Sequence, residues 1–96
     1  MTVDYRKDPL RYILNAAYQQ AMLGKGAERH AEDKSFQTQI WSVITKTVGL
    51  GFPLGQAFKK WDEAQRMARD AAVRELLGSI IYLAMAIITL LEGGEK

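Results

Sequence analysis

The sequence predicts one all-α domain of three to four helices over residues 1–96, whose last helix is apolar on two faces and forms a homo-oligomer core. Apolar residues recur at helical spacing along the chain, and no alternating strand pattern is visible. They make up 48% of the residues, against 25% charged, which is typical of a folded globular chain. Cysteine is absent, which excludes disulfides and thiolate metal sites. A 96-residue chain has a modest core, so self-association would add stability.

The first helix is expected to run from Pro9 to Gly24. Asp8 can cap it, and proline suits the first helical position. Glycine at the other end tolerates the left-handed conformation that closes many helices. Residues at i, i+3, i+4, i+7 and i+11 form one apolar face: Leu10, Ile13, Leu14, Ala17 and Ala21.

A second helix is expected after Ser35, whose side chain can cap it. Trp41 is placed on the edge of its apolar face. That face is predicted to consist of Phe36, Ile40, Val43, Ile44 and Thr47. Two glycines and a proline at residues 49–53 then interrupt the pattern.

A third helix is expected from about Leu54. Its apolar stripe is Leu54, Ala57, Phe58, Trp61, Ala64 and Ala68. Its polar face is Lys59, Lys60, Asp62, Glu63 and Arg66. At Arg69 and Asp70 the chain either turns or continues, and the sequence leaves both possibilities open.

The last helix is expected over residues 71–91 and carries two apolar stripes. The first is Val73, Leu76, Leu77, Ile80, Ala84, Ile87 and Leu91, and the second is Ile81, Met85 and Ile88. A surface helix of a small domain needs only one such stripe. The apolar run from Leu76 to Leu91 is shorter than the roughly 20 residues that span a bilayer. We therefore expect an oligomer interface and no membrane.

The net charge of +2 is too small for a protein that neutralises many phosphates, so no nucleic acid polymer is expected as a partner. A small anionic ligand, which needs two or three cationic contacts, remains compatible. Residues 1–8 are polar and lack the apolar region of a secretory signal, so a cytoplasmic location is expected.

The first candidate site is a basic loop bracketed by glycines, Gly24-Lys25-Gly26-Ala27-Glu28-Arg29-His30. Glycines allow backbone N–H groups to approach an anion, and lysine and arginine supply charge-assisted donors. The loop lacks the spacing and the Lys-Ser/Thr pair of a P-loop. His30 is the only histidine and has no clustered partner that would make it a base or a metal ligand. The alternative is an ordinary solvated loop.

The second candidate is the start of the third helix, where Gln56, Lys59 and Lys60 share a face. Helix N-termini attract anions. Lys25, Arg29 and Lys60 would hold phosphate, and Gln56 could read a base or sugar edge. Tyr12, Tyr18 or Trp41 could stack on a base, although packing explains each of them too. A solvated polar face is the alternative for the lysines.

The third candidate is a carboxylate set of Asp62, Glu63 and Glu75. The stretch 63–86, with Glu75-Leu-Leu-Gly-Ser-Ile-Ile-Tyr-Leu-Ala, resembles the second half of the MazG-type all-α nucleoside triphosphate pyrophosphohydrolases. This resemblance implies magnesium held by E-x-x-E and E-x-x-D motifs. Gly78 stands at the aspartate position, and Arg66 takes the place of the second glutamate after Glu63. We therefore expect no metal, no cofactor and no catalytic residue.

The GKG-x-ERHA loop, the GQA-x-KK stretch and the ELLG-x-I-x-Y helix also resemble small uncharacterised all-α proteins of phages and prophages. Phages encode helical oligomers that sequester nucleotides used in host immune signalling. This chain is similar to those oligomers in size and type, which suggests an anti-defence role in the host bacterial cytoplasm. The candidate residues predict non-catalytic binding of a small phosphate-bearing ligand, a nucleotide or cyclic nucleotide. Two alternatives stay open: a MazG-like pyrophosphohydrolase with Glu63 and Glu75 as ligands, and a structural or protein-interaction module.

Overall fold

The structure is a computed structural model that describes residues 4–23 and 35–93. These residues form four α-helices and one short 3₁₀ turn, with no strand among them, which confirms the all-α prediction for this part of the chain. The elements are α1 (Pro9–Leu23), η1 (Phe36–Thr38), α3 (Ile40–Val48), α4 (Gly51–Ala64) and α5 (Arg69–Leu91).

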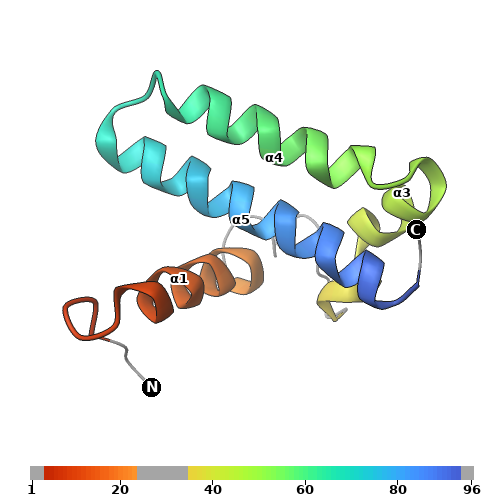
Figure 1. Ribbon diagram of the computed structural model, residues 1–96, viewed down its shortest axis with the longest axis horizontal. Coiled ribbons are helices and arrows are strands. Elements are labelled where there is room, and N and C mark those ends of the chain that lie inside the picture. The colour runs from red at the N-terminus through yellow and green to blue at the C-terminus, as the bar shows by residue number, and fades with distance from the viewer. Residues whose placement is uncertain (1–3, 24–34, 94–96) are drawn as a thin grey trace.

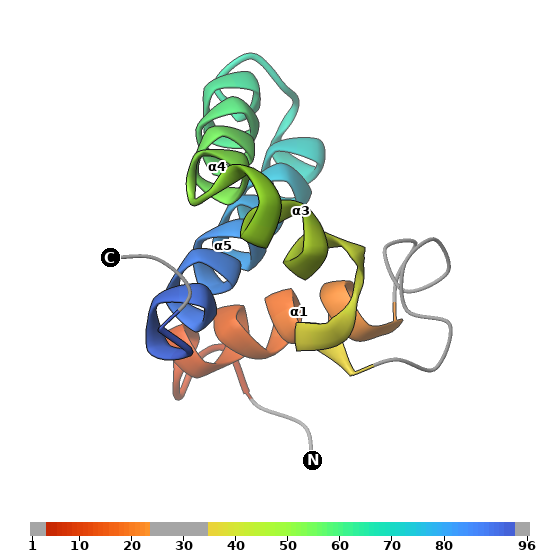
Figure 2. The same cartoon turned by 90° about the vertical axis from the view of Figure 1, so that its right-hand side faces the viewer.

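The α4–α5 hairpin is the centre of the fold. Figure 1 shows the two helices side by side and running in opposite directions. The first helix, α1, packs against α5, while α3 contacts both helices of the hairpin. Figure 2 shows α3 beside the first turns of α4, with η1 leading from it toward α1. The elements before the hairpin are therefore placed around α5.

The start of α1 is as predicted. The Arg11 N–H donates to Oδ1 of Asp8 at 3.1 Å, so this aspartate caps the helix that begins at Pro9. The predicted apolar stripe of α1 contributes less to the core than expected. Ala17 is buried, whereas Leu10 and Leu14 are exposed.

The buried face of α3 is not the predicted one. Ile40 and Val43 are exposed, and Trp41, placed on the edge by the sequence pattern, is buried. The indole N–H of Trp41 donates to the Phe36 carbonyl at 2.7 Å, which anchors the ring inside. Thr45 is buried as well, because its hydroxyl donates to the Trp41 carbonyl at 2.8 Å and is thereby satisfied.

The predicted Ser35 cap is also absent. Ser35 makes no capping bond from its side chain to the helix backbone; its hydroxyl lies 3.0 Å from that of Thr38. The segment starts as the 3₁₀ turn η1, and α3 begins only at Ile40, with Gln39 at the cap position.

The break between α3 and α4 is real but shorter than expected. Gly49 has a positive φ of 91°, which glycine adopts without a side-chain clash. The next helix starts at Gly51, and Pro53 is buried in its first turn, where a missing N–H costs no intrahelical bond. Only the small members of the predicted α4 stripe, Ala57 and Ala64, are buried.

The large apolar residues of α4 lie outside. Leu54, Phe58 and Trp61 are exposed, and the rings of Phe58 and Trp61 pack on each other with centroids 4.7 Å apart. The small residues of the stripe face α5 because two helices approach closely where side chains are short.

The chain turns before α5, which settles the question left open by the sequence. Ala68, predicted to continue the α4 stripe, is exposed and has an extended backbone with φ −63° and ψ 157°. Helix α5 begins at Arg69, two residues before the predicted start at Ala71.

One apolar stripe of α5 faces inward and the other outward. Met85 of the second stripe is buried, whereas Val73, Leu76 and Ile87 of the first are exposed; Leu77 is the buried exception. By length and composition this helix could cross a membrane, and 28% of its apolar window is buried. The fold thus leaves a long apolar surface uncovered. The expectation of no membrane, which rested on the length of the apolar run, therefore stays a prediction.

Candidate functional site

A cavity of about 570 Å³ lies where α1, η1, α3, α4 and α5 meet. This volume is within the range of roughly 300–1,000 Å³ that small-molecule sites occupy. The end of α1 contributes Gln20, and α5 contributes Arg74, Glu75 and Gly78. The other elements supply aromatic rings, Lys60 and one buried amide, Gln39.

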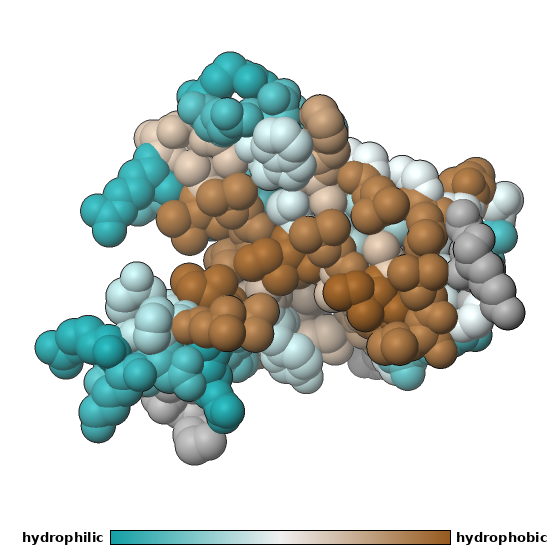
Figure 3. All heavy atoms as spheres, in the orientation of Figure 1, coloured by the Kyte–Doolittle hydropathy of each residue, from teal (hydrophilic) through white to brown (hydrophobic). Residues whose placement is uncertain are grey.

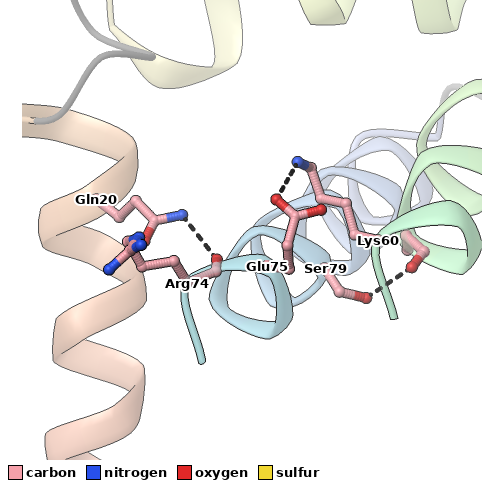
Figure 4. Close-up of polar contacts among 6 residues, drawn as sticks. Gln20, Lys60, Arg74, Glu75 and Ser79 are labelled. Carbon is pink, nitrogen blue, oxygen red and sulfur yellow. Dashed lines mark hydrogen bonds and ion pairs between the residues drawn. The ribbon is translucent and has the colours of Figure 1, made fainter. Parts of the chain in front are cut away.

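Among the residues that the structure describes, the charged side chains lining the cavity are Lys60, Arg74 and Glu75. The Lys60 ammonium lies 3.5 Å from the Glu75 carboxylate, and these side chains are 27% and 24% exposed. Figure 4 shows both side chains extending toward the η1–α3 segment. Because 3.5 Å is long for a charge-assisted bond, the lysine keeps donors for another anion.

Arg74 approaches from the α1 side. Its backbone carbonyl accepts a bond from the Gln20 side chain at 3.3 Å, which links α1 to α5 at the edge of the cavity. The guanidinium is a planar donor that binds phosphate in a bidentate manner. The cavity therefore has an ammonium on α4 and, on α5, the exposed Arg74, whose side chain extends toward α1 and away from Lys60 in Figure 4.

Gly78 determines where the Lys60 side chain lies. A Cβ added at Gly78 would come within 2.9 Å of Lys60 Cδ. The lysine stem therefore crosses α5 over this glycine, and its ammonium lies 5.9 Å from the centre of the Tyr82 ring. A glycine inside a helix lowers its stability by about 1 kcal/mol relative to alanine. The close approach of the Lys60 stem is a reason for a glycine at this position. At the next residue, the Ser79 hydroxyl donates to the Ala57 carbonyl at 2.9 Å and ties the two helices together (Figure 4).

Aromatic side chains line the cavity beside the charges. Phe36 and Trp41 pack with ring centroids 5.2 Å apart, and Phe52 meets Tyr82 edge to face at 6.0 Å. Aromatic faces next to cations suit a ligand that has a planar part and an anionic part.

Among residues 4–23 and 35–93, Lys60 of the predicted phosphate-binding residues lines this cavity, and so does Glu75 of the carboxylate set. Gln56 is half-buried and Lys59 is exposed, and neither lines it. The basic-loop residues Gly24, Lys25, Gly26, Arg29 and His30 lie outside the described residues. Trp41 is at the cavity wall, whereas Tyr12 pairs edge to face with Tyr5, and Tyr18 is exposed.

The carboxylates do not come together in one site. Asp62 accepts a bond from Arg66 at 3.0 Å, which raises the pKa of that guanidinium, while Glu75 pairs with Lys60. Within residues 4–23 and 35–93, no group of three or more histidine, aspartate or glutamate side chains could hold a metal ion. Gly78, at the aspartate position of the MazG-type pattern, instead lies beneath the lysine stem.

Arg74 and Gln39 are site residues that sequence reasoning did not select. Arg74 belongs to the charged first turns of α5, and its spacing of four from Gly78 places both on one side of the helix. A glycine within an otherwise regular apolar helix was the available signal. Nothing in the sequence pattern distinguished Gln39 from the other polar residues around it.

Comparison with known proteins adds no relative: no family model matches the chain, and neither does any curated protein or solved structure. The resemblances to MazG-type enzymes and to phage proteins therefore stay predictions.

Proposed function

We propose that this protein binds a small phosphate-bearing ligand, a nucleotide or cyclic nucleotide, without converting it. The observation that supports this most is the cavity in which Lys60 and Arg74 lie beside aromatic rings. Phosphate would be held by the two cations, and a base would lie against an aromatic face. Sequestration of a host nucleotide signal, the anti-defence role implied by the resemblance to phage proteins, needs binding alone.

Glu75 gives the cavity a built-in competitor for the ligand. Its carboxylate lies 3.5 Å from the Lys60 ammonium and partly neutralises it. A phosphate would replace this contact with shorter charge-assisted bonds from Lys60 and Arg74. Glu75 thus lowers the cost of keeping a half-buried ammonium while no ligand is bound.

We propose further that α5 holds a homo-oligomer together. Its outward residues alternate in steps of three and four: Val73, Leu76, Ile80, Leu83, Ile87 and Leu90. This is the spacing with which helices pack in coiled coils and bundles. No charged residue occurs from Leu76 to Leu91. Figure 3 shows apolar residues gathered in a band along the face that α5 occupies, and a second copy of α5 would cover it.

A protein-interaction module is the second candidate, favoured by the same uncovered face. Leu83 and Ile87 are 45% and 56% exposed, which is unusual for residues of a small core. In that case an unrelated helix would occupy the α5 surface, and the cavity would have no ligand. Binding of a nucleotide to the purified protein separates the two functions.

The test of ligand binding is calorimetry with a panel of nucleoside 5′-monophosphates and cyclic mono- and dinucleotides. Lys60→Met keeps the apolar stem over Gly78 and removes the charge. We expect it to weaken binding about 10- to 150-fold, because a charge-assisted contact contributes about 1.5–3 kcal/mol.

Lys59→Met is the matched control, since Lys59 is exposed on the same turn of α4 and does not line the cavity. Its affinity should equal that of the wild type. An equal loss of affinity in Lys60→Met and Lys59→Met would show that only the overall positive charge of the protein matters. No binding by the wild type would refute the proposed function.

A further inference from the structure

Gln39 is a buried amide whose nitrogen has no partner. The residue is 4% exposed, and Nε2 makes no hydrogen bond with any part of the chain that the structure describes. Buried polar groups are almost always hydrogen-bonded, because an amide that gives up water without replacement destabilises the fold. This unpaired donor therefore calls for a functional explanation.

The backbone of Gln39 already meets its own requirements. Its N–H donates to the Phe36 carbonyl at 3.3 Å, and its carbonyl accepts from Ser42 at 3.0 Å. The residue occupies the cap position of α3 with an extended conformation, yet its side chain makes no capping bond. Within residues 4–23 and 35–93 the amide nitrogen is therefore left without a hydrogen-bond partner.

The cavity is where such a group would lie. Gln39 lines it together with Phe36 and Trp41, and Lys60 and Arg74 line the same space. A planar ring could lie against an aromatic side chain while its edge meets the amide. Glutamine amides recognise the edges of nucleobases because they offer a donor and an acceptor in one plane.

We infer that Gln39 donates from Nε2 to an acceptor atom on the base of the bound nucleotide. This inference rests on the proposed function and specifies its ligand as one with a heteroaromatic ring, in addition to phosphate. Gln39 takes the base-reading role that the sequence pattern had suggested for Gln56.

The experiment compares Gln39→Leu with Gln37→Leu, an exposed control in η1 that does not line the cavity. Calorimetry uses three probes: the tightest nucleoside monophosphate of the panel, ribose 5-phosphate and inorganic phosphate. Gln39→Leu should weaken the nucleotide about 5- to 10-fold, the loss of one hydrogen bond, and leave both base-free probes unchanged. Without ligand, its melting temperature should rise by about 4 °C or more, because an unpaired buried amide is removed.

Three results would overturn the inference in distinguishable ways. If Gln39→Leu binds the nucleotide as the wild type does, the amide does not read the base, although the proposed function stands. If the wild type binds neither nucleotide nor phosphate, the proposed function fails as well.

Gln39→Glu keeps the shape and replaces the donor with an acceptor. Unfolding of both Gln39 variants would show a structural role for the amide and end the inference.

Discussion

At the residue scale, the roles of single side chains depend on partners that sequence order does not reveal. Lys60 was predicted to hold phosphate, and it lines the cavity; its neighbour Lys59 points to solvent. Both lie on the polar side of the same helix, so their spacing alone could not separate them. The difference arises because Lys60 crosses α5 at Gly78. Gly78, which first suggested a lost metal ligand, is thus a packing residue.

A substitution at Glu75 tests whether its carboxylate competes with the ligand for Lys60. Glu75→Gln removes the carboxylate that competes for Lys60, so we expect affinity for a nucleotide to rise up to about 5-fold, the equivalent of an ion pair of about 1 kcal/mol. Calorimetry measures the change. A metal-dependent pyrophosphohydrolase would behave in the opposite way, because the same substitution would remove a magnesium ligand. Magnesium-dependent pyrophosphate release by the wild type, abolished in Glu75→Gln, would contradict the binding account.

At the scale of elements, the sequence predicted where helices occur better than which faces they bury. The start of α1 and the break at Gly49 follow from local chemistry, namely a cap and a positive φ. The buried faces of α3 and α4 do not, because large apolar residues of both helices, such as Val43 and Phe58, are exposed. Helical periodicity identifies an apolar stripe but not which surface covers it. On α4 the small residues Ala57 and Ala64 are buried and the large ones are exposed, whereas on α3 the large Trp41 is buried.

The prediction at this scale concerns the outward face of α5. Leu83→Glu places a charge in the middle of it, which a buried interface would not tolerate without a partner. Light scattering should give a multiple of 10.8 kDa for the wild type and a lower mass for the variant. Met85 is unsuitable for this test because it is buried within the protomer.

Gln65→Glu is the control, since it adds the same charge at an exposed position after α4. It should leave the mass unchanged. A wild type that stays at 10.8 kDa at every concentration would refute the oligomer. A wild type that is recovered only in detergent and sediments with lipid vesicles would instead assign α5 to a membrane.

At the scale of the whole molecule, the two unusual features serve different needs. In the proposed homo-oligomer a second copy would cover the exposed α5 face, and this burial would add stability to a chain of 96 residues. Lys60, Glu75 and Gln39 all line the cavity beside α5. The Lys60–Glu75 ion pair is long, at 3.5 Å, and the Gln39 amide nitrogen has no hydrogen-bond partner among the described residues. Lys60, Trp41 and Glu75, which the sequence singled out, line the cavity, whereas Gln56 and Lys59 do not. The location of the cavity depends on packing of α1, α3 and α5, which local patterns do not encode.

The central claim is that the protein holds a nucleotide and releases it unchanged. The most direct measurement is equilibrium dialysis of the wild type, with magnesium present, against the nucleotide panel and nucleoside triphosphates. The ligand is then released by denaturing the protein and identified by mass spectrometry. The account predicts that at least one nucleotide is retained above its free concentration and recovered intact. Retention of none, or recovery as a monophosphate with pyrophosphate, would contradict it.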